Sequence, residues 1–342
     1  MTTVERHIEG FKKLGDYLRN IDKKNIQYQA LFDCIQNAKH HNGWFTETSC
    51  LQALKSWGEL LSPASLEQWM AAYTWEERPQ KHLGLILAGN IPLVGFHDVI
   101  CTLLCGHRAQ IKLSSSDPLL IPFLVNKLEK LDPIFSDRIA FTQNRLDHFD
   151  AVIATGSNNA ARYFEHYFAK VPCLIRKNRN GIAVLNGTET EEELAGFAKD
   201  IMQYYGLGCR STAKVYLPKG YDLNLIFGAL YPYSFVTESE KYCNNYDYNK
   251  AVFLMSEFEL LDNGFFLLRE ESSFSSPIGC LHYEYYESEE KLKLHLEDQA
   301  ENIQCVSTKL EHLSAIGLGQ AQQPLLWDYA DNVDTVKFLQ QL

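Results

Sequence analysis

Cys209 is the residue of this 342-residue chain whose surroundings best suit covalent chemistry. It stands in Gly-Leu-Gly-Cys-Arg-Ser (206–211), between a helix-like segment and a strand-like one. A thiol beside glycine in such a turn is open to a substrate, and neighbouring backbone N–H groups can stabilise a thiolate and an oxyanion. A structural thiol is the competing interpretation, because the chain holds nine cysteines in all.

Asn90 offers a second group suited to the same reaction. It follows the apolar, strand-like run 85–88 and precedes a helix-like segment, so it lies at the carboxyl end of a strand, where ligands of α/β sheets bind. Its amide could donate to the oxyanion that forms when a thiolate attacks a carbonyl. The alternative is an ordinary asparagine that caps the next helix.

Two further turns suggest a nucleotide site. Lys112 ends a strand-like run and Ser115 follows it, and both fit a ribose or a phosphate; a solvated lysine and a serine-rich helix cap are the alternative. A later apolar strand is followed by Thr155, Gly156 and Ser157, and the backbone N–H groups of Gly156 and Ser157 at a helix start favour an anionic phosphate.

Composition limits the class of protein. The net charge of −11 comes from scattered acids, which argues against a nucleic-acid partner. The first residues lack the apolar core of a signal peptide and no apolar stretch reaches membrane-spanning length, so we expect no membrane span and a cytoplasmic location. Irregularly spaced cysteines indicate a reducing compartment, and Cys101 and Cys105 lack a second ligand pair, so no metal site is expected.

Hydrophobic periodicity predicts a helical N-terminal lead over 4–73, followed by alternating strands and helices. The alternation is typical of a doubly wound α/β fold. The expected strands are 82–88, 108–113, 137–142, 150–154, 171–176, 181–185 and 212–217, with apolar runs near 264–268 and 278–285; the expected helices are 94–106, 117–131, 158–169, 190–205, 223–230 and 238–255.

The order of these motifs resembles the aldehyde dehydrogenase superfamily over roughly 80–285. Ala-Gly-Asn-Ile-Pro-Leu-Val-Gly-Phe-His-Asp (88–98), Gly-His-Arg (106–108), Lys-Leu-Ser-Ser (112–115) and Gly-Leu-Gly-Cys-Arg-Ser (206–211) are similar to its acyl-CoA reductase (LuxC-like) branch. The resemblance implies two Rossmann-like α/β lobes. Residues 1–183 would form the dinucleotide-binding lobe with its helical lead and 184–325 the thiol-bearing lobe, with 326–342 as a tail packing back.

The resemblance also assigns roles to the two reactive groups. It makes Cys209 the nucleophile that accepts an acyl group, with Asn90 and the Cys209 backbone N–H forming the oxyanion site. His97, one or two helical turns after Asn90, could face the cleft as a proton donor to the leaving thiolate or the aldehyde oxygen; a structural histidine is the interpretation we prefer.

For the cofactor, the resemblance implies that Lys112 and Ser115 hold the adenosine ribose and that Thr155, Gly156 and Ser157 line the dinucleotide path. Many relatives that prefer NAD carry a glutamate where this chain has Ser115, and a serine would not repel a 2′-phosphate. NADPH is therefore favoured, with NADH left open.

Two more segments bear on the reaction. Residues 174–181 contain no carboxylate, whereas aldehyde-oxidising members carry there the glutamate that activates water; exchange of the acyl group with another thiol is then favoured over hydrolysis. Glu-Glu-Ser-Ser-Phe-Ser-Ser-Pro (270–277) resembles the superfamily's Glu-Glu-x-Phe-Gly-Pro element, which makes Glu271 a candidate contact to the nicotinamide ribose; a polar loop is the alternative.

The expected function is NADPH-dependent reduction of an acyl thioester, carried by coenzyme A or acyl carrier protein, to an aldehyde. A dehydrogenase of aldehydes or semialdehydes that uses no coenzyme A, and a non-catalytic dinucleotide-binding module, are the alternatives. A homodimer stays open as its assembly. Gly-Leu-Gly-Gln-Ala-Gln (317–322) opens no strand–helix–strand unit and is expected to be a loop.

Overall fold

The computed structural model describes residues 3–313 and 315–342, in two compact units. The first comprises the described residues up to Lys177 together with Leu325–Leu342, and the second comprises Asn178–Pro324. The division thus falls before the 183/184 boundary taken from the sequence. The reason is β6 (Asn180–Val184), which pairs with β7 (Thr212–Pro218) and β11 (Ile303–Thr308) of the second unit.

A parallel sheet of five strands forms the core of the first unit, in the order β3-β2-β1-β4-β5. The central strands carry the most apolar side chains, because both of their faces are covered. Strand order reverses between β1 and β4, which is the switch point where doubly wound sheets bind ligands. The strands are β1 (His82–Ile86), β2 (Arg108–Lys112), β3 (Ile139–Thr142), β4 (Ala151–Thr155) and β5 (Cys173–Arg176).

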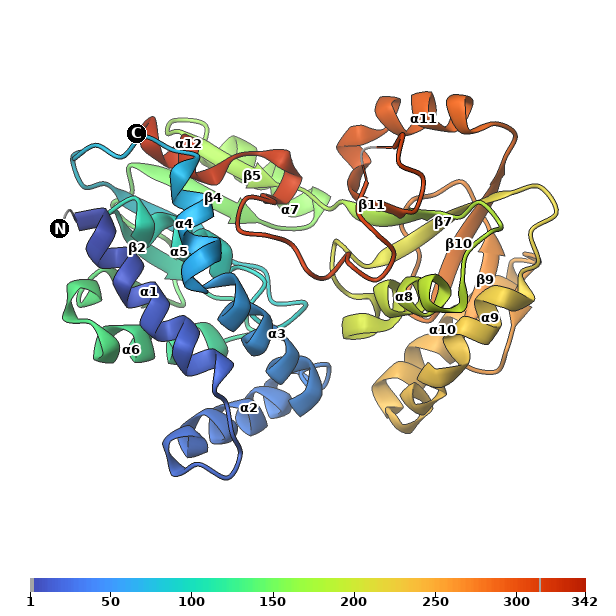
Figure 1. Cartoon of the computed structure of the whole chain (residues 1–342), viewed down its shortest axis with the longest axis horizontal. Helices are drawn as coiled ribbons and strands as arrows, with labels where there is room; N and C mark the ends of the chain where they lie inside the picture. Colours follow the sequence, from blue (N-terminus) through green and yellow to red (C-terminus); the bar gives the residue numbers. More distant parts are fainter. Residues whose placement is uncertain (1–2, 314) are drawn as a thin grey trace. The chain divides into compact units, whose positions relative to one another are not determined.

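Helices cover both faces of this sheet, because right-handed crossovers send those after β1 and β2 to one face and the one after β4 to the other. On the latter face, Phe164 and Phe168 pack against Val152 and Ala154 of β4. The helical lead packs over the helices of the opposite face (Figure 1). The helices are α1 (Thr3–Arg19), α2 (Gln29–His41), α3 (Glu47–Leu60), α4 (Pro63–Ala71), α5 (Phe96–Leu104), α6 (Leu120–Leu131), α7 (Asn158–Tyr167) and α12 (Thr335–Gln340).

The C-terminal tail belongs to the first unit through buried polar contacts. The guanidinium of Arg176, at the end of β5, forms an ion pair of 2.6 Å with Asp98 and donates to the Ala330 carbonyl and the Thr335 hydroxyl. Arg176 and Asp98 are both buried. Removing Asp98 would leave the Arg176 guanidinium as an uncompensated buried charge. The bonds from Arg176 to Ala330 and Thr335 are the ones that tie the tail to β5.

The second unit has a six-stranded sheet in the order β11-β6-β7-β10-β9-β8. Only β8 runs antiparallel to its neighbour. In Figure 1, α11 lies on one face of this sheet and α8, α9 and α10 lie on the other. The remaining strands are β8 (Leu261–Asp262), β9 (Leu267–Glu270) and β10 (Cys280–Tyr286), and the helices are α8 (Glu191–Met202), α9 (Asn224–Leu230), α10 (Glu240–Met255) and α11 (Glu289–Asp298).

Short 3-10 helices complete the two units. Those in the first unit are η1 (Ile26–Tyr28), η2 (Pro133–Phe135) and η6 (Ala330–Asn332), and those in the second are η3 (Gln203–Gly206), η4 (Tyr231–Glu238) and η5 (Ala300–Asn302).

The fold agrees with the expected α/β class and differs from it locally. Helix α6 begins at Leu120 and not at Asp117, because the Asp117 carboxylate is used in the turn before it. Helix α8 ends at Met202, before the predicted 205, because the backbone then enters the left-handed region. Strand β11 and helices α11 and α12 were not predicted, since polar residues interrupt their apolar pattern.

Candidate active site

The carboxyl edge of the first sheet gathers most of the residues that the sequence singles out. Strand β1 pairs with both β2 and β4, so Ile86 lies opposite Lys112 on one side and Ala154 on the other. The turns that follow these strands therefore start at the same edge. The residues brought to it are Asn90, Lys112, Ser115, Thr155, Gly156 and Ser157.

The Asn90 side chain is exposed, and the turn that carries it is held by hydrogen bonding to Asp117. Leu93, three residues on, has a left-handed backbone with φ of 62°. Its N–H donates to the Asp117 carboxylate over 3.2 Å, and the Leu120 N–H donates to the same group over 3.3 Å. Asp117 is buried, and burial raises its pKa to about 6. One carboxylate thus links the Asn90 turn to the start of α6.

A close approach of two turns makes Gly89 necessary. A Cβ atom at Gly89 would lie 2.6 Å from the Ser114 Cβ and 3.0 Å from the Asp117 backbone nitrogen. Real Cβ atoms do not approach other atoms so closely, so a side chain here would displace the Ser114 turn. The Asn90 turn and the turn that carries Ser115 are therefore packed as one structure.

The predicted cofactor residues differ in exposure and in the hydrogen bonds that they already make. Lys112 is half-buried at the end of β2, and Ser115 is exposed. Ser157, in contrast, uses its hydroxyl to accept from the Ala160 N–H as the cap of α7, and the Gly156 N–H donates to the Arg176 carbonyl over 3.3 Å. To bind a phosphate, the Gly156 N–H would have to give up its bond to the Arg176 carbonyl, whereas the Ser157 hydroxyl can still donate while it caps α7. The nucleotide contacts of all five residues stay predictions.

Cys209 lies in a turn with an unusual backbone. Tyr204, Tyr205 and Gly206 are all left-handed, with φ of 53°, 58° and 75°, which ends α8 and reverses the chain. The Ser211 N–H then donates to the Gly208 carbonyl over 2.9 Å. The thiol itself is half-buried. Left-handed tyrosines cost free energy and persist only where surrounding contacts hold them.

The Cys209 turn crosses β6 so closely that only glycine fits beneath it. A Cβ atom at Gly181 would lie 2.5 Å from the Arg210 carbonyl oxygen and 2.7 Å from that of Ser211. The Arg210 side chain continues to the predicted loop 317–322, donating to the Ala321 carbonyl over 2.5 Å. This stretch is indeed a loop, and its contact with the thiol turn was not predicted.

Glu271 is tied into its own loop. Its carboxylate accepts from Arg269 over 2.6 Å and from the Ser273 N–H. Register places Glu270 level with Val215 of β7, because both pair with Tyr283. The Cys209 turn precedes Thr212, so the sheet does not bring Glu271 to it, and the contact of Glu271 with a nicotinamide ribose stays a prediction.

The other candidate groups are structural by their contacts. His97 lies 2.9 Å from the Leu326 carbonyl, within an aromatic cluster that includes Trp69 and Tyr329, and burial lowers its pKa. Cys101 is buried beside it. Within the described residues, no group of three or more His, Cys, Asp or Glu side chains could hold a metal ion. No helix that the structure describes is both long and apolar enough to span a membrane.

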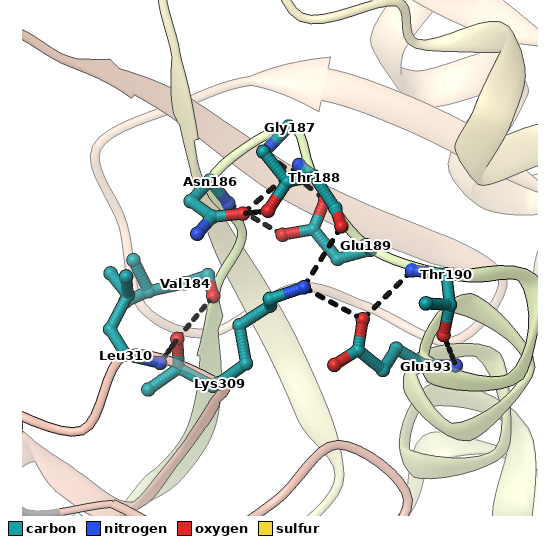
Figure 2. Close-up of polar contacts among 10 residues, drawn as sticks. Val184, Asn186, Gly187, Thr188, Glu189, Thr190, Glu193, Lys309 and Leu310 are labelled. Atoms are coloured by element: carbon teal, nitrogen blue, oxygen red, sulfur yellow. Dashed lines mark hydrogen bonds and ion pairs between the residues drawn. The ribbon is translucent and has the colours of Figure 1, made fainter.

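The opposite end of α8 is anchored by the polar cluster of Figure 2. Thr190 and Glu193 form a reciprocal capping box, in which each side chain accepts from the other residue's N–H. Lys309, just after β11, donates to Glu193 over 3.0 Å and to the Thr188 carbonyl over 2.9 Å. Helix α8 leads into the Cys209 turn, and its start is thereby held by Lys309, which is more than a hundred residues away in the chain.

Comparison with known families matches the part of the chain that carries Asn90, Lys112 and Cys209. The model of the family described as "Acyl-CoA reductase (LuxC)" matches residues 9–225, more than half of the chain. "Long-chain acyl-protein thioester reductase 2" of Photobacterium leiognathi is 28% identical over 198 residues, and "Long-chain acyl-protein thioester reductase" of Aliivibrio fischeri is 28% identical over 197. These matches cover 52% and 53% of this chain but only 40% and 41% of the relatives.

Solved structures of similar fold are aldehyde dehydrogenases. Aldehyde dehydrogenase 21 from Physcomitrella patens matches all of this chain and 84% of its own, with a TM-score of 0.67 and 12% identity. A Mycobacterium tuberculosis aldehyde dehydrogenase, solved with NAD+, matches 90% of this chain and 73% of its own, with a TM-score of 0.61 and 14% identity. At such identity the likeness establishes the aldehyde-dehydrogenase-like fold, as the sequence motifs predict.

Proposed function

The chain belongs to the acyl-CoA reductase (LuxC) family, and on that premise we propose that it reduces a long-chain acyl thioester to the aldehyde through a thioester on Cys209. The observation that carries this proposal is the Cys209 turn. Its half-buried thiol lies within the stretch matched by the family model, and Gly181 and the 317–322 loop support the turn closely. Cys50, Cys101 and Cys280 are buried and offer no such access.

Cys209 would act first as a nucleophile. Its sulfur attacks the thioester carbonyl, and the tetrahedral oxyanion is stabilised by the Cys209 backbone N–H and the Asn90 amide. The carrier thiol leaves as the carbonyl re-forms, so that the acyl group is now bonded to Cys209. Residues 174–181 supply no carboxylate to activate water, which favours a thioester that persists until it is reduced.

Reduction of the Cys209 thioester to a thiohemiacetal needs a hydride, which NADPH would supply when bound. Lys112 and Ser115 are the residues that would hold its ribose, because an ammonium and a hydroxyl stand together at the edge where such sheets bind nucleotides. Ser115 presents no negative charge to a 2′-phosphate, which is the reason to favour NADPH over NADH. Collapse of the thiohemiacetal returns the Cys209 thiol and releases the aldehyde.

The test is intact-protein mass spectrometry after incubation with acyl thioesters in the absence of nucleotide. Donors of several chain lengths are offered on coenzyme A and on acyl carrier protein, because the named relatives act on acyl-protein thioesters. We expect an adduct of one acyl group that is lost, with formation of aldehyde, when NADPH is added. The donor that reacts fastest identifies the carrier.

Two variants decide whether the adduct is on the proposed residue. Cys209→Ala should form no adduct, whereas Cys243→Ala, which removes another half-buried thiol of the same unit, should react like the unchanged protein. An adduct on the Cys209→Ala protein would refute the mechanism. A protein that forms no adduct with any donor, yet oxidises free aldehydes, would be a dehydrogenase of the coenzyme-A-independent kind.

A further inference from the structure

Two contacts brace the Cys209 turn from the loop 317–322. Besides the bond from Arg210 to the Ala321 carbonyl, the Gln322 amide donates to the Ser211 hydroxyl over 2.9 Å. That hydroxyl also accepts from the Gly208 N–H over 3.2 Å. Ser211 and Gln322 are both buried. The two residues that follow Cys209 are therefore held by a segment more than a hundred residues later in the chain, and Gly208 is held through Ser211.

The bracing segment is in turn held by a single carboxylate. Asp200, on the last turn of α8, accepts from the Gly319 N–H over 2.7 Å and from the Ala321 N–H over 3.0 Å. Its side chain is fully buried, and burial raises its pKa. Both carboxylate oxygens are thus used to fix two backbone groups of one short loop.

Backbone packing leaves this loop little freedom. A Cβ atom at Gly196 of α8 would lie 2.7 Å from the Leu318 carbonyl oxygen, and Gly319 adopts φ of 88° against it. Helix α8, which carries Asp200, is anchored at its other end by the bond between Lys309 and Glu193 (Figure 2). The contacts therefore run without a break from helix α8, through the Asp200 carboxylate and the 317–322 loop, to the Cys209 turn.

We propose that Asp200 is a positioning residue for Cys209, acting through residues 319–322. A buried carboxylate with two backbone donors is costly to keep unless it fixes something, and here the loop it fixes contacts both Arg210 and Ser211. Loss of the carboxylate would free the loop and then the thiol turn, whose left-handed tyrosines are held only by their surroundings. The link to catalysis rests on the proposed function, whereas the placement of the thiol can be measured without it.

The experiment measures alkylation of individual cysteines by iodoacetamide, with peptide mass spectrometry on the full chain. Asp200→Asn replaces one acceptor by a donor that faces a backbone N–H. We expect the half-buried Cys209 to react about tenfold faster, because the turn around it opens more often. Cys280 is the internal reference: it lies buried in the same unit, and burial raises its pKa to about 12, so it reacts only if the whole unit opens.

A second variant keeps the test decisive if Asp200→Asn fails to fold. Gln322→Ala removes the contact to Ser211 and should also speed alkylation of Cys209. Its matched control is Gln323→Ala, because the exposed Gln323 reaches only the Gly319 carbonyl at 3.5 Å. An unchanged Cys209 rate in the folded variants, or Cys209 and Cys280 rising together, would overturn the proposal, since the second result describes a residue that only stabilises the unit.

Activity then separates positioning from the proposed reaction. With an acyl thioester that the unchanged protein accepts, the Asp200→Asn protein should show a kcat about tenfold lower with little change in KM, because the thiol is misplaced and the donor site is not. A rise of KM by about tenfold with kcat unchanged would contradict a positioning role. If the unchanged protein forms no acyl adduct, the proposed function fails, and the alkylation rates still judge Asp200.

Discussion

The Asn90 turn of the first unit and the Cys209 turn of the second are held by similar devices at different distances along the chain. Each follows or contains left-handed residues that are not glycine. A glycine that admits no Cβ atom stands within the first turn (Gly89) and against the second (Gly181). Asp117, 24 residues from Leu93, holds the first turn directly. The second turn is held by a loop 111 residues away, which Asp200 fixes in its turn.

The comparison teaches that two reactive groups can depend on the fold to different degrees. The Asn90 turn is built from consecutive strand–turn–helix units, so its supports are close in sequence. The Cys209 turn relies on a return of the chain after β11. We therefore expect damage to remote residues to affect the thiol more than the amide.

Removing the reactive groups themselves should give the largest effects. Cys209→Ala should lower the rate of aldehyde formation by about 10⁴-fold or more, since loss of a nucleophile leaves no covalent route. Aldehyde is measured by gas chromatography with the donor identified by adduct formation. Turnover within tenfold of the unchanged protein would place the nucleophile elsewhere.

Asn90→Ala should be less severe. Loss of one oxyanion donor typically lowers kcat by about 10²–10³-fold, and the Cys209 N–H would remain. The rate of adduct formation in a single turnover measures this step directly. A variant that acylates at the normal rate would remove Asn90 from the oxyanion site.

Gly181→Ala should destabilise the second unit by about 3 kcal/mol, because two backbone carbonyl oxygens block the new Cβ atom and cannot move without the Cys209 turn. Urea denaturation measures the loss. Gly228→Ala is the matched control, since no atom lies within 4 Å of the position of its Cβ atom. Equal stability of the two variants would show that the turn yields easily.

Gly89→Ala should cost less, about 2 kcal/mol, because its nearest obstacle is the Ser114 Cβ atom and not a backbone carbonyl oxygen. The double variant Gly89→Ala/Ser114→Gly removes that obstacle and should recover part of the loss. If Gly89→Ala proves as damaging as Gly181→Ala, the two turns are equally rigid and the contrast between them fails.

The smallest effect concerns the pH dependence of Asp117. Burial raises its pKa from 3.8 to about 6, so the folded state holds the proton more tightly than the unfolded chain. This contribution to stability is fully present below pH 4 and is lost as pH rises through 6. Relative to Asp117→Asn, the unchanged protein should gain about 1 kcal/mol in free energy of unfolding between pH 7 and pH 5. A difference independent of pH would show that Asp117 titrates normally.

The sequence alone predicted the α/β class, most strands and helices, and the residues able to do chemistry. Those predictions rest on neighbours in sequence: hydrophobic period for the elements, and residue type beside a strand end for Asn90, Lys112 and Ser115. Edge strand β11 and helix α11 were not predicted, because polar residues interrupt the hydrophobic periodicity of both segments. The Ser157 hydroxyl also caps α7, and its role toward a phosphate stays a prediction.

Tertiary structure decided how the reactive turns are held. That Asp117 reaches Leu93, that Gly181 lies beneath Arg210, and that Asp200 fixes the loop against the thiol turn are contacts between residues far apart in the chain. The sequence does not show which distant residues will be hydrogen-bonded, because Asp, Gly and Arg are also common in solvent-exposed turns that make no such contact. Residue chemistry is local and was read from the chain; the supports that place it arise only when the strands pair and the distant loop returns.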